Sequence, residues 1–254
     1  AGLRTDNKYN PFPEEMNRRL TTQLADLHFA PTDRAREELL ADGVPAKDIF
    51  ITGNTVIDAL LETASRPFTF TEPPLDKVDF GRYRTILVTA HRRENWGEPI
   101  RNICRALRDI LEEFPDTQAI FQMHKNPLVR DVIRAELAGR ERILLVEPQE
   151  YVPWVQLMKR AYLVLTDSGG IQEEAPSLGV PALVLRETTE RPEGVEAGAA
   201  RLVGTNPEKI KAAARELLGN AEVHQRMAQT VNPYGDGHAA QHFREIVFQR
   251  YGLE

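Results

Sequence analysis

Short apolar runs alternate with helical periodicity along most of this chain. Continuous runs of apolar and β-branched residues predict buried strands at 85–89, 119–123, 143–146, 162–166 and 182–185. Between them, apolar residues spaced at i, i+3, i+4 and i+7 predict helices, most clearly over 99–113. Apolar strands that alternate with helices are typical of a parallel sheet with helices on both faces. We therefore expect an α/β fold built on a parallel sheet.

The two ends of the chain show a smaller version of the same pattern. Strands predicted at 27–30 and 49–52 flank a helix at 34–41, which makes a β–α–β fragment. The last predicted helix, 239–251, has an apolar face that suits packing on this fragment.

Prolines divide the chain. Pro67, Pro73 and Pro74 mark the best candidate for an interdomain linker. The predicted division is the C-terminal part of a first domain at 1–54, a second domain at 55–238, and a helix returning to the first domain at 239–254.

Composition excludes several functional classes. The 254 residues are 41% hydrophobic and 28% charged, with a formal net charge of −6, which argues against a general nucleic-acid surface. No apolar run approaches the about 18 residues of a membrane span. The single cysteine, Cys104, excludes an internal disulfide and fits a reducing compartment, so we expect a cytoplasmic protein. Cys104 also falls on the apolar stripe of its helix and is expected to be a core thiol.

Polar groups follow four of the predicted strands. Ligands bind at the carboxyl ends of the strands in open parallel sheets, so these groups are expected at the ligand edge. They are His91 to Glu94, His124 to Asn126, Asp167 to Gly170, and Arg186 to Arg191.

The corner after the strand at 162–166 has the chemistry of a phosphate site. Ser168 is a good N-cap, and Gly169 and Gly170 allow a ligand close to the backbone at the positive end of a helix. Glu174 would lie roughly 9 Å further along this helix, a fair reach from a diphosphate to a ribose hydroxyl. The corner therefore suggests a nucleotide, although an ordinary loop before a helix explains these residues equally well.

Other side chains at this edge have two interpretations. His91 with Arg92 and Arg93 suits a diphosphate, whereas a lone histidine after a strand is more often structural. Arg191 suits phosphate or a sugar hydroxyl, or else an ion pair with Glu187 or Glu190. Trp154 opens a helix where it can stack on a base, although an aromatic there is usually core. The six histidines have no metal-ligand spacing, so no metal or other cofactor is expected.

Seven motifs in one order resemble the bacterial non-hydrolysing UDP-N-acetylglucosamine 2-epimerases. The resemblance covers nearly the whole chain and rests on Ala1 to Thr5, Pro11 to Arg18, Phe50 to Asp58, His91 to Glu94, Thr166 to Gly179, Thr189 to Glu193, and Asn232 to Gly237. It implies two Rossmann-like domains of the glycosyltransferase-B type with the active site between them. This chain would hold the end of the first domain and all of the second.

The resemblance also implies the site. His91, Ser168, Gly169 and Gly170 would hold the diphosphate of UDP, Glu174 the ribose and Trp154 the uracil. Arg191 would act near the departing diphosphate or the sugar, and Glu14 and Arg18 would line the sugar side. Some members bind a second UDP-N-acetylglucosamine as an activator, and Arg92 and His124 match those positions, with Glu14 shared.

The family's reaction inverts C2 of UDP-N-acetylglucosamine by elimination and re-addition of UDP, in cell-envelope polysaccharide synthesis. The resemblance implies Glu14, His91 and Arg191 as catalytic residues, UDP-N-acetylglucosamine and UDP as partners, and a homodimer. The family's opening strands, an arginine, an aspartate and the glutamate just before Ala1 are absent. If the protein starts at Ala1, we expect UDP binding without epimerisation. A glycosyltransferase of the same fold, a hydrolysing relative and a non-catalytic nucleotide-sugar-binding module are the alternatives.

Overall fold

The computed structural model describes residues 1–9 and 12–253, which form two compact units. Unit 1 contains residues 1–62 and 232–254, and unit 2 contains residues 63–231. The first division therefore falls inside helix α3 (Thr55–Ser65), later than the predicted boundary after residue 54. The chain returns to unit 1 at residue 232, earlier than the predicted boundary after residue 238. Pro11 of the quoted motif and Glu254 of the predicted last helix lie outside the described residues.

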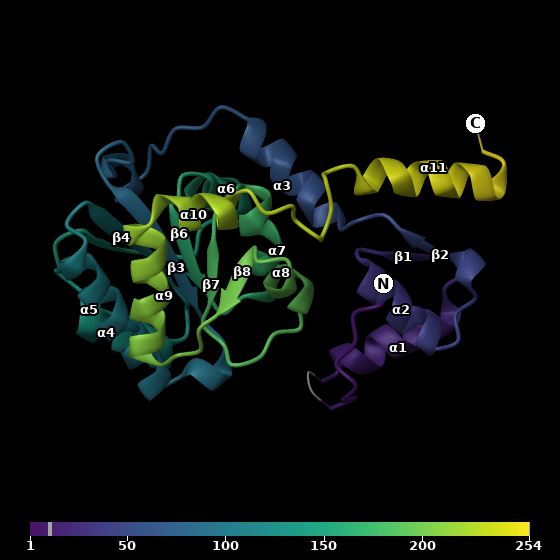
Figure 1. The fold of residues 1–254 in the computed structure, drawn as a ribbon, viewed down its shortest axis with the longest axis horizontal. Helices are drawn as coiled ribbons and strands as arrows, with labels where there is room; N and C mark the ends of the chain where they lie inside the picture. The colour runs from purple at the N-terminus through teal and green to yellow at the C-terminus, as the bar shows by residue number, and fades with distance from the viewer. Residues whose placement is uncertain (10–11, 254) are drawn as a thin grey trace. The chain divides into compact units, whose positions relative to one another are not determined.

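Unit 2 is a doubly wound parallel sheet (Figure 1). Its strands are β3 (Arg84–Ala90), β4 (Thr117–Met123), β5 (Ile143–Val146), β6 (Leu163–Thr166), β7 (Ala182–Val184) and β8 (Ala200–Leu202). They lie in the order β5-β4-β3-β6-β7-β8, and every neighbouring pair is parallel. The order reverses between β3 and β6, which is the switch point where such sheets bind ligands. The α/β fold with a Rossmann-like parallel sheet is confirmed.

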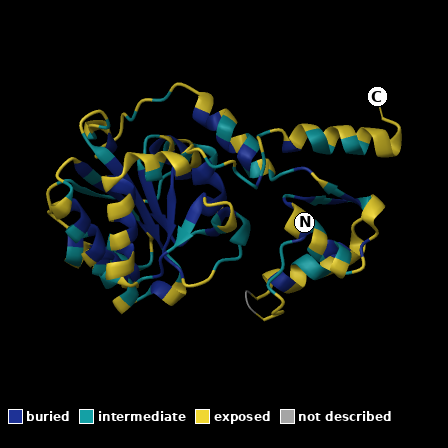
Figure 2. Ribbon diagram, in the orientation of Figure 1, coloured by how far each residue is buried: buried dark blue, intermediate teal, exposed yellow. Residues whose placement is uncertain are grey.

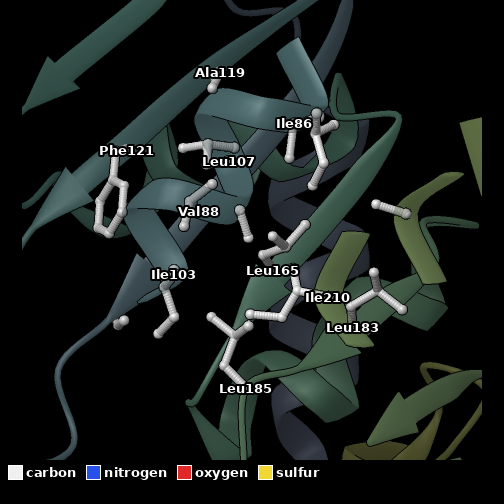
Figure 3. Close-up of a cluster of buried hydrophobic side chains, with 14 of the residues drawn as sticks. Ile86, Val88, Ile103, Leu107, Ala119, Phe121, Leu165, Leu183, Leu185 and Ile210 are labelled. Atoms are coloured by element: carbon white, nitrogen blue, oxygen red, sulfur yellow. The ribbon is translucent and has the colours of Figure 1, made fainter. Parts of the chain in front are cut away.

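Helices cover both faces of this sheet. They are α4 (Glu98–Glu113), α5 (Pro127–Leu137), α6 (Tyr151–Lys159), α7 (Gly169–Ser177), α8 (Pro192–Glu196), α9 (Pro207–Gly219) and α10 (Ala221–Ala228), with 3-10 turns η2 (Leu75–Lys77) and η3 (Arg93–Asn95). Helices α4, α5 and α9 pack on one face, where alternate strand residues such as Val88, Phe121 and Leu165 meet Leu107 and Ile210 (Figure 3). Most residues of β3, β4, β6 and β7 are buried, which explains their continuous apolar runs, whereas the edge strands β5 and β8 are mostly half-buried (Figure 2). Cys104 is fully buried in this cluster, as expected.

The segment at 66–83, suggested as a linker, is instead part of unit 2. Arg160 of α6 donates from Nη2 to the Phe68 carbonyl at 2.7 Å, and its guanidinium lies over the rings of Phe70 and Phe80. Lys159, also on α6, donates to the carbonyl of Ala64, which lies just before this segment, at 2.7 Å. The linker prediction was wrong because prolines favour a locally extended backbone but do not prevent the segment from packing on α6.

Unit 1 is a small β–α–β fragment closed by the last helix. It contains β1 (His28–Ala30) and β2 (Ile49–Ile51) as a parallel pair, with α1 (Glu14–Leu24), α2 (Asp33–Ala41), η1 (Ala46–Asp48) and α11 (Ala239–Tyr251). Phe243 of α11 stacks on Phe29 of β1 at 4.1 Å between ring centroids. The Asp58 carboxylate accepts from the backbone N–H of Ala239 and Ala240 and so caps α11.

A close backbone contact precedes α11. Asn54 N–H donates to the Tyr234 carbonyl at 2.7 Å, and Gly53 and Gly235 meet there with φ of +79° and +136°. A side chain on Gly53 would place Cβ 3.0 Å from the Gly235 Cα, so both positions need glycine.

The N-cap residue of α9, Asn206, can be tested by a single substitution. Its side-chain oxygen accepts from the backbone N–H of Glu208 and Lys209. We expect Asn206→Ala to lower the free energy of unfolding by about 1 kcal/mol, measured by urea denaturation. The matched control is Glu208→Ala two residues further on, which removes an 80% exposed carboxylate and should change stability by less than about 0.5 kcal/mol. Equal effects of both variants would argue against the cap.

Candidate functional site

The switch point is built around one buried carboxylate at the end of β6. Asp167 is 0% exposed and accepts from the backbone N–H of His91 and of Arg92, each at 2.9 Å. The Asn95 amide also donates to Asp167 at 2.9 Å, and to the Leu185 carbonyl beyond β7 at 3.1 Å. The loop after β3 is thereby fixed to the ends of its neighbouring strands.

His91 lies against the same carboxylate. Its Nδ1 is 3.2 Å from Asp167 Oδ1, and its ring stacks on that of His124 with centroids 6.0 Å apart. Burial lowers the pKa of His91, the Asp167 carboxylate opposes this effect, and Arg92 and His124 lower the pKa further. The structure therefore brings together the two histidines that the sequence placed at the ends of β3 and β4.

Two guanidinium groups converge on the start of α7. A methyl group at Gly169 would lie 3.8 Å from Arg92 Nη2 and 3.9 Å from Arg191 Cζ. Gly170 next to it is exposed, and a methyl group there would meet nothing within 4 Å. A helix N-terminus with two cations beside it and open space before it favours a multiply charged anion.

Arg191 has an intrachain partner, but not either of those expected. Its guanidinium pairs with Glu173 of α7 rather than with Glu187 or Glu190. Glu190 instead lies 3.8 Å from Arg92 and 3.6 Å from the buried Arg186. Arg191 is consequently held against the first turns of α7, where an anion would bind.

Ser168 occupies the N-cap position of α7, as predicted, but its side chain makes no capping hydrogen bond. The Ser168 N–H donates to Thr166 Oγ1 at 3.0 Å, and its carbonyl accepts from Gln172. The first-turn N–H groups of α7 therefore have no side-chain cap, which leaves them available to a ligand.

A second buried carboxylate lies further along α7. Glu174 is 7% exposed, and its described partner is the Tyr151 hydroxyl, which donates to Oε1 at 3.4 Å. Burial, opposed by the Tyr151 hydrogen bond and aided by the nearby Glu173, raises the pKa of Glu174 to about 7. The pKa of Tyr151 rises to about 12 because of burial and the nearby carboxylate. A buried acceptor with one neutral donor has capacity for ligand hydroxyls.

Trp154 lies on the same helix, α6, one turn beyond Tyr151. The Trp154 side chain is 7% exposed, so it is mostly covered in this structure. The Trp154 backbone N–H donates to the Glu150 carbonyl in the first turn of the helix. Because residues three apart share a helix face, Trp154 lies on the Tyr151 side of α6.

Two neighbouring glutamates on α1 of unit 1 have different environments. Glu14 is exposed on α1, whereas Glu15 is fully buried and accepts from Arg18 at 3.0 Å and Arg19 at 2.9 Å. The Thr5 N–H also donates to Glu15, which ties the first residues of the chain to α1. Arg18 is therefore oriented by Glu15, and these bonds lower the pKa of Glu15 despite the opposing effect of burial.

The sequence placed Asp167 at the ligand edge, but its role in fixing the loop after β3 was missed, as were Asn95 and Tyr151. Asp167 offered a signal, because a carboxylate directly after a buried strand needs hydrogen-bond partners where the chain leaves the sheet. Asn95 and Tyr151 gave none. Among residues 1–9 and 12–253, no cluster of histidine, cysteine and acidic side chains could hold a metal ion, and no helix is long and apolar enough to cross a membrane.

Comparison with known proteins places this site in a family. The family model described as UDP-N-acetylglucosamine 2-epimerase matches residues 1–247. A putative UDP-N-acetylglucosamine 2-epimerase of Thermotoga maritima is 51% identical over 253 residues, which are 100% of this chain and 67% of that protein. This chain spans about two thirds of the length of such relatives.

Solved structures agree with the sequence comparison. A putative UDP-N-acetylglucosamine 2-epimerase from Listeria monocytogenes is 51% identical with a TM-score of 0.93, over 100% of this chain and 67% of that one. The Neisseria meningitidis enzyme, solved bound to UDP-GlcNAc, is 44% identical with a TM-score of 0.89, over 98% of this chain and 68% of that one. The chain belongs to the UDP-N-acetylglucosamine 2-epimerase family.

Proposed function

We propose that this chain is the UDP-binding part of an isomerase that interconverts UDP-N-acetylglucosamine and UDP-N-acetylmannosamine. The observation that carries the proposal is the convergence of Arg92 and Arg191 on Gly169 at the switch point of the sheet. The uncapped start of α7 adds N–H donors at the same place. This arrangement suits the diphosphate of a nucleotide sugar.

The proposed diphosphate contacts are His91, Ser168, Gly169 and Gly170, with Arg191 beside them. The ribose hydroxyls donate to Glu174, whose neutral partner leaves acceptor capacity, and the uracil meets Trp154 one turn beyond Tyr151 on α6. Each group lies at or after the carboxyl end of a strand in unit 2, as the switch-point rule requires.

The proposed reaction removes the C2 proton with anti elimination of UDP and then adds UDP back with the proton on the opposite face. The C2 proton is weakly acidic, so the step needs a positioned acid and base, and we assign Glu14 to that set with Arg18 on the sugar side. His91 and Arg191 stabilise UDP as it leaves, because charge develops on the diphosphate. Glu14, His91 and Arg191 are the proposed catalytic residues.

We further propose a second UDP-N-acetylglucosamine as an activator, contacting Arg92 and His124, with Glu14 shared. A cytoplasmic homodimer completes the proposal. Exposed apolar residues at four-residue spacing on α1, Met16, Leu20 and Leu24, support an interface on that helix, since they are 36%, 61% and 86% exposed.

Incubation with UDP-N-acetylglucosamine in D2O, followed by NMR, separates this function from its alternatives. Epimerisation by this route places deuterium at C2 of UDP-N-acetylmannosamine without net release of UDP. Release of UDP only with an acceptor sugar indicates a glycosyltransferase, and free N-acetylmannosamine with UDP indicates a hydrolysing enzyme. Saturable binding with no exchange indicates a binding module for these 254 residues.

A further inference from the structure

Asp167 is more than a loop anchor, because its two oxygens have different partners. Oδ2 accepts three hydrogen bonds at 2.9 Å, from the backbone N–H of His91, the backbone N–H of Arg92 and the Asn95 amide. Oδ1 lies 3.2 Å from His91 Nδ1 and 3.1 Å from the backbone nitrogen of the same residue. The carboxylate is 0% exposed, so these bonds hold it in one orientation.

The carboxylate oxygen Oδ1 favours a proton on Nδ1, the ring nitrogen of His91 that lies 3.2 Å from it. A carboxylate oxygen accepts and does not donate, so the ring form with an N–H at Nδ1 is favoured over the form with a lone pair there. We propose that Asp167 is a positioning residue that fixes the Nδ1–H form of His91 and reserves Nε2 for the diphosphate of the substrate. The inference rests on the proposed function for its ligand, but not for the state of the ring.

The charges around His91 then explain how the ring responds to ligand. Asp167 favours the imidazolium, whereas Arg92, His124 and burial disfavour it. A diphosphate beside Nε2 adds negative charge, which shifts the balance towards the cation. His91 takes up a proton from solvent at Nε2 as UDP binds and donates it in a hydrogen bond to a phosphate oxygen. No bond within the protein is broken.

Nitrogen-15 NMR of histidine-labelled protein tests the state of the ring without ligand. At pH 8 we expect Nδ1 of His91 to have the shift of a protonated nitrogen and Nε2 that of an unprotonated one, with the signals assigned by their loss in His91→Gln. A ring protonated at Nε2, or an equal mixture, would overturn the proposal. This measurement needs no change at Asp167.

Asp167→Asn gives a sharper outcome. Three donors meet Oδ2, so the amide oxygen should take that place and the amide N–H2 should face His91 Nδ1. We expect the neutral ring to switch to the Nε2–H form and UDP binding at pH 7 to weaken by about tenfold. The matched control is Asn95→Ala, which loosens the same loop but leaves the contact of His91 with Asp167. A purely structural role predicts that both variants weaken binding and neither changes the ring.

The state of the His91 ring and the binding of UDP test the positioning role and the proposed ligand separately. If the wild-type ring is in the Nδ1–H form but UDP does not bind, the positioning role of Asp167 stands and the proposed ligand is wrong. If UDP binds to a ring in the Nε2–H form, the ligand is right and the positioning role is wrong.

Discussion

Gly170→Ala should stabilise unit 2 and at the same time remove most of its affinity for UDP. A methyl group at Gly170 would meet nothing within 4 Å, and this residue has no positive φ, so alanine fits the first turn of α7 without strain. Replacing glycine by alanine in a helix stabilises by roughly 0.5–1 kcal/mol. We place the diphosphate in the open space at the start of α7, so a methyl group at the exposed Gly170 should obstruct it, and we expect UDP affinity to fall at least tenfold, or about 1.4 kcal/mol.

Gly219→Ala is the matched control. It also lies in a helix, α9, without positive φ and with nothing within 4 Å of the added methyl group. It should change UDP binding less than twofold by calorimetry. If Gly170→Ala binds UDP as tightly as the wild type, the start of α7 is not the phosphate site.

Glu174→Gln should raise stability at high pH and weaken UDP binding. The pKa of Glu174 is raised to about 7 by burial, so the folded protein holds a proton that the unfolded chain loses near pH 4.5. Below about pH 4.5 the folded protein is therefore more stable than it would be with an ionised Glu174. This contribution to the free energy of unfolding is lost as the pH rises from about 4.5 towards 7. Glutamine keeps the shape without the charge, so above pH 7 we expect it to increase the free energy of unfolding by about 3 kcal/mol.

Urea denaturation from pH 4 to 8 measures this difference, which should be near zero at pH 4 and largest above pH 7. Binding should move in the opposite direction. Hydrogen bonds from ribose hydroxyls to a carboxylate contribute about 1.5–3 kcal/mol, so the affinity for UDP at pH 8 should fall about tenfold or more. Tyr151→Phe, which removes only the hydroxyl next to Glu174, should leave the ribose acceptor in place. A stability gain with unchanged UDP binding would remove Glu174 from the nucleotide site.

Much of the fold was predictable because the central strands of unit 2 are buried on both faces. The run at 182–185 contains no polar residue, and β7 within it is buried throughout. The edge strand β5 is mostly half-buried, but its range was predicted because 143–146 contains no polar residue. Strand β8 was missed because it has three residues, of which only Ala200 is buried. Helices α8 and α10 were also missed. Helix α8 has five residues, and α10 directly follows α9 at Asn220, which caps it.

The site was predictable in position but not in pairing. Strand ends in a parallel sheet share one edge, so His91, His124 and Gly169 could be placed together from the sequence alone. Which carboxylate pairs with Arg191 could not, because the chain offers several acidic residues within reach and only the tertiary structure selects Glu173. The same holds for Glu14 and Glu15, which are adjacent in sequence but exposed and buried respectively.

Calorimetric titration of this chain with UDP and with uridine tests whether the start of α7 binds a diphosphate. We expect saturable UDP binding with a dissociation constant below about 1 mM, or about −4 kcal/mol, and uridine binding at least tenfold weaker, because the proposed diphosphate site lies beside Arg191 at the start of α7. No UDP binding, or equal affinity for uridine and UDP, would contradict a diphosphate site at this switch point.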